Sequence, residues 1–257
     1  MIDPIAFHLG PLAVHWYGIA YLVGLATSIF IAIQLNKKRH VFKNKEQIYD
    51  LAFWAFLFGV ILGGRLGYVL FYNFSYYFTH PAKILVIWEG GMSFHGGLLG
   101  MLIVGYFYCK KHKIRFLDAA DLSAAPASFA LVFGRLANFV NQELVGRVIQ
   151  NPRWQGLGFD FGDGMLRYPS QLFAAGKDLL LFLILLFIFH QKPRRGVLLS
   201  SFLIGYGMLR FIVEFFRAPD PQIGFIFQIF TLGQIFSLGM ILFGGFLWLK
   251  TCSKRPI

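Results

Sequence analysis

Long apolar runs alternate with short polar segments along the whole chain. Because about 20 apolar residues cross the hydrocarbon core of a bilayer as a helix, each run predicts a membrane span. The seven predicted spans cover residues 14–36, 48–72, 93–110, 116–135, 169–190, 197–216 and 229–249. The pattern therefore predicts an all-α integral membrane protein with about seven transmembrane helices.

Basic residues are distributed unevenly among the segments that join these spans. Of the 24 lysines and arginines, 15 lie close to the ends of the first, third, fifth and seventh spans or in the segments after them. By the positive-inside rule these segments are cytoplasmic, which puts the amino terminus outside and the carboxyl terminus in the cytoplasm. The longest extracytoplasmic segment, near 136–168, is rich in Gly, Pro and Asp, which predicts an irregular loop with room for a short hairpin.

Composition supports this assignment and limits the classes of function. The chain of 257 residues is 57% hydrophobic and only 14% charged, with a mean hydropathy of +0.61. These values lie outside the range of soluble domains. No polar linker is long enough to separate two domains, so residues 1–257 are expected to form a single polytopic membrane domain. The amino terminus carries an acid and no basic region, which argues against a cleaved signal peptide.

A net charge of +12 raises the question of nucleic-acid binding. The placement of the basic residues in short loops between apolar runs argues against it and favours contacts with anionic headgroups of membrane lipids. The sequence contains no Walker loop, G-x-S-x-G elbow or H-E-x-x-H motif, and its two cysteines are too far apart for a local metal site. We therefore predict no cofactor and no metal.

Residues 134–147, GRLANFVNQELVGR, follow the fourth apolar run and are rich in amide and guanidinium groups. On a continued helix, Arg135, Asn138 and Asn141 or Gln142 recur every three or four residues and share a face. The plainer interpretation is a solvated helix end whose arginines meet lipid headgroups. Because arginine presents a bidentate fork to phosphate oxygens, the density of these groups favours a specific anion site.

Residues 93–100, SFHGGLLG, begin the third predicted span. Glycines there leave backbone N–H groups accessible at the positive end of a helix dipole, which suits a phosphate. His95 adds a side chain that can exchange a proton near neutral pH. A helix start with close-packed glycines and a hydrogen-bonded histidine explains the spacing slightly better.

Residues 206–217, YGMLRFIVEFFR, place Tyr206, Arg210, Glu214 and Arg217 at steps of four, four and three residues. One helix face therefore carries a hydroxyl, two cations and a carboxylate. A structural Arg–Glu pair is the simplest explanation, but the second arginine leaves positive charge over and favours an anionic ligand. Arg65, within the second span, is likewise expected to face protein, water or a polar ligand.

Two further segments at the outer level carry weaker signals. In HWYG, residues 15–18, Trp16 is best explained as an interfacial anchor, whereas Tyr17 can donate a hydrogen bond to a ligand. In YPSQ, residues 168–171, Pro169 suits the first turn of a helix, where its missing N–H is not needed. These segments and the arginines together suggest chemistry on, or transport of, a lipid phosphate, and a small lipid or anion transporter with a charged path is the alternative to an enzyme.

At this point a family resemblance becomes visible. The motifs HWYG, SFHGGLLG, GRLANFVNQELVGR, YPSQLF and YGMLRFIVEFFR occur in the order found in prolipoprotein diacylglyceryl transferases, and the sequence resembles that family over nearly its whole length. The resemblance implies transfer of the diacylglyceryl group of phosphatidylglycerol to the lipobox cysteine of a preprolipoprotein signal peptide, forming a thioether and releasing glycerol phosphate. It also implies a bacterial cytoplasmic (inner) membrane location, the first step of lipoprotein maturation, and a site on the outer-leaflet side.

The resemblance also implies roles for single residues. His95, Arg135 and Arg210 fall on positions implied for catalysis, with Arg135 also the expected ligand of phosphatidylglycerol. The other motif positions, expected to bind substrate, are Tyr17, Asn138, Glu143, Gly146, Tyr206 and Glu214. Tyr168 and Phe173 stand where the family often has the His and Tyr of HPSQLYE, so no role is carried over there.

Overall fold

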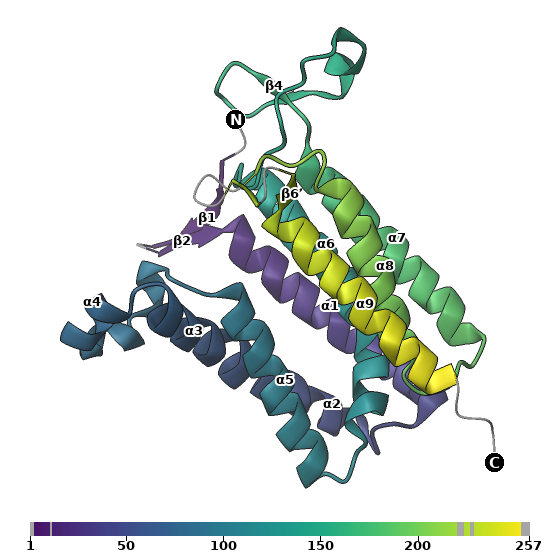
Figure 1. The fold of residues 1–257 in the computed structure, drawn as a ribbon. Coiled ribbons are helices and arrows are strands. Elements are labelled where there is room, and N and C mark those ends of the chain that lie inside the picture. Colours follow the sequence, from purple (N-terminus) through teal and green to yellow (C-terminus); the bar gives the residue numbers. More distant parts are fainter. Residues whose placement is uncertain (1–2, 11, 220–223, 227–228, 253–257) are drawn as a thin grey trace. The chain divides into compact units, whose positions relative to one another are not determined.

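The computed structural model describes residues 3–10, 12–219, 224–226 and 229–252, and it is mostly helical (Figure 1). The long helices are α1 (Trp16–Arg39), α5 (Phe94–Lys111), α6 (Phe116–Val140), α7 (Ser170–His190), α8 (Val197–Val213) and α9 (Leu232–Cys252). A further long helix consists of α2 (Lys45–Trp54), the π-helical η1 (Ala55–Gly63) and α3 (Gly64–Phe71). Helices therefore occupy all seven ranges that the apolar pattern predicted.

The remaining elements are short. In the part of the chain that the structure describes, they are α4 (Phe74–Thr79), η2 (Pro81–Leu85), η3 (Ile87–Glu89), η4 (Pro152–Leu157) and three antiparallel hairpins, β1 (Ile5–Leu9) with β2 (Leu12–His15), β3 (Phe159–Asp160) with β4 (Leu166–Arg167), and β5 (Phe225–Ile226) with β6 (Phe230–Thr231). The β3–β4 hairpin confirms the expectation for the loop near 136–168. The β1–β2 hairpin was not predicted.

Among the described residues, five helices are long and apolar enough to cross a membrane: α1, Lys45–Phe71, α6, α7 and Leu232–Thr251. Helix α8 is apolar but has only 17 residues. The structure thus shows a mostly helical chain with five candidate spans, and the total of seven and the orientation of the termini stay predictions. Of the basic residues that indicated orientation, Lys254 and Arg255 lie outside the described residues.

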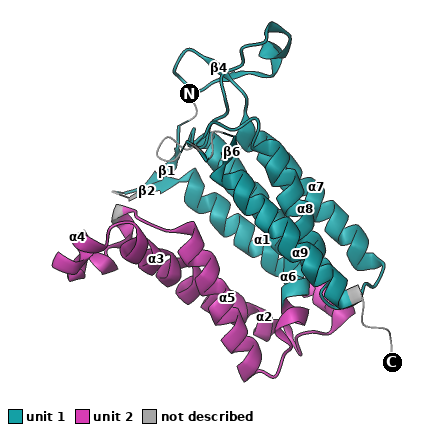
Figure 2. Ribbon diagram, viewed as in Figure 1, with its two compact units in different colours: residues 1–32, 120–257 teal, residues 33–119 magenta. Residues whose placement is uncertain are grey.

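The chain divides into two compact units (Figure 2). Unit 1 comprises residues 1–32 and 120–257, and unit 2 comprises residues 33–119. The single domain expected from the sequence stays a prediction.

In unit 2, α5 packs against η1 and α3 through glycines. A Cβ atom on Gly63 would lie 2.8 Å from the carbonyl oxygen of Gly96, and one on Gly67 would lie 2.7 Å from the Cα of Gly96. A Cβ on Gly100 would lie 2.5 Å from the carbonyl oxygen of Gly59. Small residues at four-residue spacing let two helix backbones approach closely, as at many helix contacts in membranes.

In unit 1, α8 packs against both α7 and α9 (Figure 1). A Cβ on Gly207 of α8 would lie 2.7 Å from the carbonyl oxygen of Ser237 in α9, so these helices also depend on a small residue. Asp121 of α6 accepts hydrogen bonds from the backbone N–H groups of Gly196, at 2.6 Å, and Leu199, at 2.8 Å. A carboxylate from another helix thereby caps the start of α8, where unpaired N–H groups and the helix dipole favour an anion.

Candidate functional site

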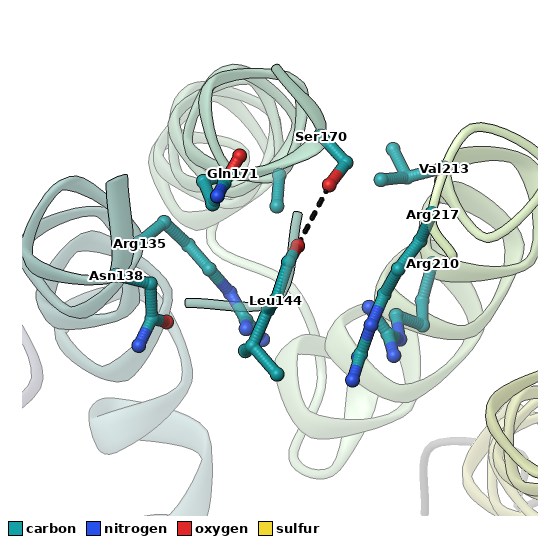
Figure 3. A pocket seen from close by; sticks show the side chains of 9 residues that line it. Arg135, Asn138, Leu144, Ser170, Gln171, Arg210, Val213 and Arg217 are labelled. Carbon is teal, nitrogen blue, oxygen red and sulfur yellow. Dashed lines mark hydrogen bonds between the residues drawn. The ribbon is translucent and has the colours of Figure 1, made fainter. Parts of the chain in front are cut away.

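A small cleft in unit 1 brings together residues from three helix ends and the loop that follows α6 (Figure 3). The space among these residues is about 240 Å³, and part of it is open to the exterior. The lining residues are Arg135, Asn138, Leu144, Ser170, Gln171, Ala174, Arg210, Val213 and Arg217.

Three of the lining residues are arginines, and among the described residues that line the cleft none is acidic. In the view of Figure 3, Arg135 lies on one side of Leu144 and Arg210 and Arg217 lie on the other. The guanidinium groups are therefore collected around one space by helices α6 and α8 and the residues after α8. A cleft with this charge attracts anions, and planar guanidinium forks match phosphate oxygens in particular.

Arg135 is held from two sides. Its Nε lies 3.7 Å from Oδ2 of Asp178, an ion pair too long for a hydrogen bond, and its Nη2 donates to the hydroxyl of Tyr206 at 3.4 Å. The side chain is 18% exposed, whereas that of Asp178 is fully buried. In the described part of the chain, these contacts leave Nη1 and one N–H of Nη2 for a ligand.

The neighbours of Arg135 include a buried pair that the sequence reasoning did not select. Lys177 Nζ contacts Oδ1 of the adjacent Asp178 and lies 3.9 Å from the ring centre of Tyr206. Both charged side chains lie about two turns into α7, a largely apolar helix. A signal was present in the sequence, because ionisable residues inside a membrane span are rare and commonly functional.

Arg210 is held by a second carboxylate. Its Nη2 lies 2.7 Å from Oε2 of Glu214, one helical turn later, and Oε1 of Glu214 accepts a hydrogen bond from the hydroxyl of Thr231 at 3.1 Å. The hydroxyl of Thr231 also accepts a hydrogen bond from the backbone N–H of Gln234, at 3.3 Å, and thereby caps the amino-terminal end of α9. The carboxylate of Glu214 therefore sits at the start of α9, where Gly233 leaves it room: a Cβ there would lie 2.7 Å from Oε1.

The prediction of one continued helix face from Arg135 to Gln142 is wrong. Helix α6 ends at Val140, and Gln142 has a left-handed φ of 57°. The N–H groups of Gln142 and Glu143 bond back to the carbonyl oxygens of Phe139, at 3.1 Å, and Asn138, at 2.9 Å. These two bonds form a Schellman motif, which turns the chain away from the helix axis.

Two predicted site residues stabilise this turn. Asn138 donates from Nδ2 to Oε2 of Glu143 at 3.0 Å, while the backbone carbonyl of Glu143 accepts from Gln171 at 2.7 Å. The next residue with a left-handed φ is Leu144, at 55°, and its carbonyl accepts from the hydroxyl of Ser170 at 2.9 Å. Bulky residues rarely adopt a positive φ without tertiary support, and here these hydrogen bonds provide it. Held in this way, Leu144 lines the cleft.

Gly146 connects the loop to two other segments. It forms an isolated antiparallel bridge with Arg217, and a Cβ at Gly146 would lie 2.1 Å from the carbonyl oxygen of Tyr168. The neighbouring Arg147 donates from Nε to the carbonyl oxygen of Arg217 at 3.0 Å. No side chain fits at position 146 without displacing backbone, so this glycine sets the position of the residues that follow α8.

The loop beyond Gly146 ends in the β3–β4 hairpin, where Asp163 and Arg167 form an exposed pair. Arg167 Nε donates to Oδ2 of Asp163 at 2.7 Å, and its Nη1 donates to the carbonyl oxygen of Gly146 at 3.3 Å. The hydrogen bond from Arg167 lowers the pKa of the Asp163 carboxyl, with the backbone N–H of Met165 as a further cause.

Tyr17 belongs to unit 1 but does not line the cleft. Its hydroxyl shares a hydrogen bond of 3.1 Å with that of Tyr21, and its ring centre lies 4.8 Å from that of Tyr21. Tyr17 is within electrostatic reach of Arg135 and Glu143. Of the nine predicted site residues, the cleft is thus lined by Arg135, Asn138 and Arg210, and Glu143, Tyr206 and Glu214 contact these three.

His95 lies in unit 2, in the first turn of α5, and is exposed there. The idea that the adjacent glycines leave free backbone N–H groups is corrected by two bonds. The N–H of Gly96 donates to the hydroxyl of Ser93 at 3.2 Å, and that of Gly97 donates to the carbonyl of Ser93 at 3.0 Å. The close-packed interpretation holds for Gly96 and Gly100, whose absent side chains admit the neighbouring helix.

Arg65 in unit 2 is saturated by protein. Its guanidinium donates five hydrogen bonds to backbone carbonyl oxygens of the segment 83–91, and its Cζ lies 5.1 Å from the ring centre of Tyr77. This arginine therefore holds the loop in place. Among the residues that the structure describes, no group of three or more His, Cys, Asp or Glu side chains is arranged to hold a metal ion.

Comparisons with known proteins agree with the chemistry of the cleft. A sequence model described as prolipoprotein diacylglyceryl transferase matches residues 4–250. A protein of Geobacter sulfurreducens is 45% identical over 244 residues, which are 95% of this chain and 93% of that protein. A protein of Legionella pneumophila is 45% identical over 249 residues, 96% of each chain, and one of Photobacterium profundum is 44% identical over 256 residues, 99% of this chain and 95% of that one.

All three relatives carry the name phosphatidylglycerol–prolipoprotein diacylglyceryl transferase. The similarity extends over nearly the whole length of this chain and of each relative. It includes the helices and the loop that form the arginine cleft. The chain belongs to the prolipoprotein diacylglyceryl transferase family.

Proposed function

We propose that this protein transfers the diacylglyceryl group of phosphatidylglycerol to the lipobox cysteine thiol of a preprolipoprotein. The observation that carries the proposal is the cleft of unit 1, lined by three arginines and by no acid among its described residues, in a chain of this family. The names of its relatives indicate the substrates, and the cleft offers a place for the lipid phosphate.

The phosphate is proposed to bind between Arg135 and Arg210. Arg135 has its Nη1 directed to no protein acceptor in the described part of the chain, and Arg210 is held in place by Glu214. Arg217 adds a third cation to the same lining. Since a phosphodiester carries a single negative charge, the cleft can also accommodate the additional charge that develops when the phosphate departs.

The reaction is a displacement at the carbon of the diacylglyceryl group that is bonded to the phosphate oxygen. The thiol loses its proton, because the thiolate is the nucleophile. A sulfur–carbon bond forms as the carbon–oxygen bond breaks, and glycerol phosphate leaves with the electron pair of that bond. Arg135 and Arg210 stabilise the leaving group, a role in which preorganised cations are worth more in a site shielded from water.

His95 is proposed to accept the thiol proton, because histidine is the side chain that most often acts as a general base. The remaining residues are proposed to bind or orient substrate: Tyr17, Asn138, Glu143, Gly146, Tyr206 and Glu214. For Glu214 the support is its ion pair with Arg210, and for Tyr206 it is the hydrogen bond from Arg135.

The two units are proposed to act as one membrane domain in the bacterial cytoplasmic membrane, with seven spans and the site on the outer-leaflet side. The short basic segments support an external amino terminus and a cytoplasmic carboxyl terminus. A topology reporter fused after Lys250 tests this orientation, and an extracytoplasmic signal there contradicts it.

The proposed reaction is tested by incubating the purified protein with phosphatidylglycerol and a lipobox peptide. We expect the peptide mass to increase by one diacylglyceryl unit and glycerol phosphate to appear in equal amount. A matched peptide in which Ser replaces the lipobox Cys serves as the control and gains no mass. Movement of lipid between leaflets with no covalent change in the peptide contradicts the proposal and favours a transporter.

A further inference from the structure

The buried pair Lys177 and Asp178 lies directly behind Arg135 and has no role in the reaction described above. Lys177 is 5% exposed and Asp178 is 0% exposed. Burying two charges is unfavourable unless their contacts compensate for lost hydration. Lys177 contacts both groups that hold Arg135, Asp178 and Tyr206, and this position suggests what the pair does.

Asp178 divides its two carboxylate oxygens between two cations. Oδ1 contacts Lys177 Nζ, while Oδ2 faces Arg135 Nε at 3.7 Å. The main chain of Asp178 is fixed as well, since its carbonyl oxygen accepts from the hydroxyl of Ser128 in α6 at 2.8 Å. The carboxylate is thereby shared, and it touches Arg135 at Nε rather than across the two terminal nitrogens.

Lys177 also supports the second partner of Arg135. Its Nζ lies 3.9 Å from the ring centre of Tyr206, a cation–π contact, and the hydroxyl of Tyr206 accepts from Arg135 Nη2. One ammonium group therefore contacts both groups that hold the guanidinium. Without Lys177, Asp178 would keep only Arg135 as a described cation beside it. Arg and Asp favour a bidentate pair, in which two guanidinium nitrogens donate to the two carboxylate oxygens.

We propose that Lys177 is a positioning residue that occupies Asp178 and supports Tyr206, so that the terminal nitrogens of Arg135 remain available to the lipid phosphate. This inference rests on the proposed function, because it assigns the phosphate of phosphatidylglycerol to Arg135. Lys177 neutralises Asp178, so Arg135 keeps its full charge for the ligand. The lysine touches neither the lipid nor the thiol.

The test is a set of steady-state measurements in mixed micelles at saturating lipobox peptide, with the mole fraction of phosphatidylglycerol varied. Lys177→Met frees Asp178 to capture Arg135, and we expect the KM for phosphatidylglycerol to increase about tenfold, as when a charge-assisted hydrogen bond is lost. In Lys177→Met/Asp178→Asn the capturing carboxylate is gone, and KM is expected to return to within about threefold of the unmodified protein.

The matched control is Lys250→Met, which removes an exposed lysine that lies 5.9 Å from the ring centre of Phe246. It is expected to leave KM unchanged. A merely structural lysine would lower the amount of active protein and hence kcat, without raising KM and without rescue by the second substitution. A KM unchanged in Lys177→Met, or raised as much in the double variant, overturns the inference.

Two outcomes keep the inference separate from the function on which it rests. If the unmodified protein produces no diacylglyceryl peptide, the proposed function fails before Lys177 is tested. If Lys177→Met does not accumulate as folded protein, the double variant decides, because it lacks both buried charges. A KM about tenfold above that of the unmodified protein in the double variant then contradicts the inference, and one within about threefold supports it.

Discussion

Arg65 in unit 2 and Arg135 in unit 1 both lie on long apolar helices, and their surroundings differ in kind. All five N–H groups of Arg65 donate to backbone carbonyl oxygens, and the residue is only 3% exposed. Arg135 donates one side-chain hydrogen bond in the described part of the chain, to Tyr206, and its ion pair with Asp178 is 3.7 Å long.

The difference lies in what satisfies the guanidinium group. Carbonyl oxygens are neutral and fixed by the backbone, so Arg65 contributes to the position of a loop and has no donor left for a ligand. Carboxylate and hydroxyl partners at Nε and Nη2 leave the outer edge of Arg135 open to the cleft. A membrane-embedded arginine is therefore better judged by its unused donors than by its depth in the span.

The largest expected effect is on the activity of Arg135→Lys. Lysine keeps the charge but loses the planar fork, and we expect transfer to the lipobox peptide to decrease about 100-fold or more. The thermal unfolding midpoint is expected to stay close to that of the unmodified protein, because Arg135 makes few protein contacts. Full transferase activity in Arg135→Lys would argue against a bidentate phosphate contact.

The second prediction concerns Arg65→Lys, the same substitution in the other environment. Three lysine donors cannot replace five, and each buried carbonyl left without a donor costs about 1–3 kcal/mol. We expect the free energy of unfolding to decrease by roughly 3 kcal/mol, measured in detergent by tryptophan fluorescence. The folded fraction should keep most of its specific activity. A large loss of activity with an unchanged unfolding midpoint would remove the distinction between the two arginines.

The sequence predicted the helices well because each apolar run is a local signal. All seven predicted ranges contain a helix, and Arg135, Asn138 and Arg210 do line one cleft. The glycines of SFHGGLLG could be read in two ways, since spacing does not show which neighbour a glycine faces. Their packing against Gly63 and Gly67 depends on a helix about 30 residues earlier.

What the sequence could not predict depends on contacts between distant residues or on the exact end of a helix. The carbonyls that satisfy Arg65 lie 18 to 26 residues away, and Arg135 and Tyr206 are 71 residues apart. Nothing in the letters NFVNQEL fixed the end of α6 at Val140, because Gln142 is an uncommon residue at a left-handed helix end. Lys177 and Asp178 were visible as charges in an apolar run, but their partners were not.

The third prediction extends the comparison to the support of Arg210. Thr231→Val removes the hydroxyl that donates to Glu214 and that caps α9. We expect the free energy of unfolding to decrease by about 1 kcal/mol, as for a lost helix cap, and transfer activity to decrease by about threefold as Glu214 holds Arg210 less firmly. Both are measured on the purified protein.

The control for this change is Thr251→Val at the other end of α9, where the hydroxyl donates to the carbonyl oxygen of Trp248. That substitution should leave transfer activity unchanged. If Thr231→Val and Thr251→Val affect activity equally, Thr231 acts on the helix in general rather than on Arg210 through Glu214.

The smallest effect is expected at Arg167, whose partner Asp163 is exposed and thus provides a third environment for comparison. The hydrogen bond from Arg167 lowers the pKa of Asp163, so the folded hairpin favours the ionised carboxylate. Its stabilising contribution is therefore complete at neutral pH, persists down to the unfolded pKa of about 3.9, and is lost as pH falls through the lower folded pKa.

Asp163→Asn keeps a side-chain oxygen for the N–H of Met165 and removes the charge. Asp160→Asn is the matched control in the same hairpin. Hydrogen–deuterium exchange of residues 159–167 should be faster in Asp163→Asn than in the unmodified protein at pH 7, and the difference should vanish in strong acid. The effect is expected to be small, because surface ion pairs contribute little and are screened by salt. A difference that persists in strong acid would show that the charge of Asp163 does not stabilise this hairpin.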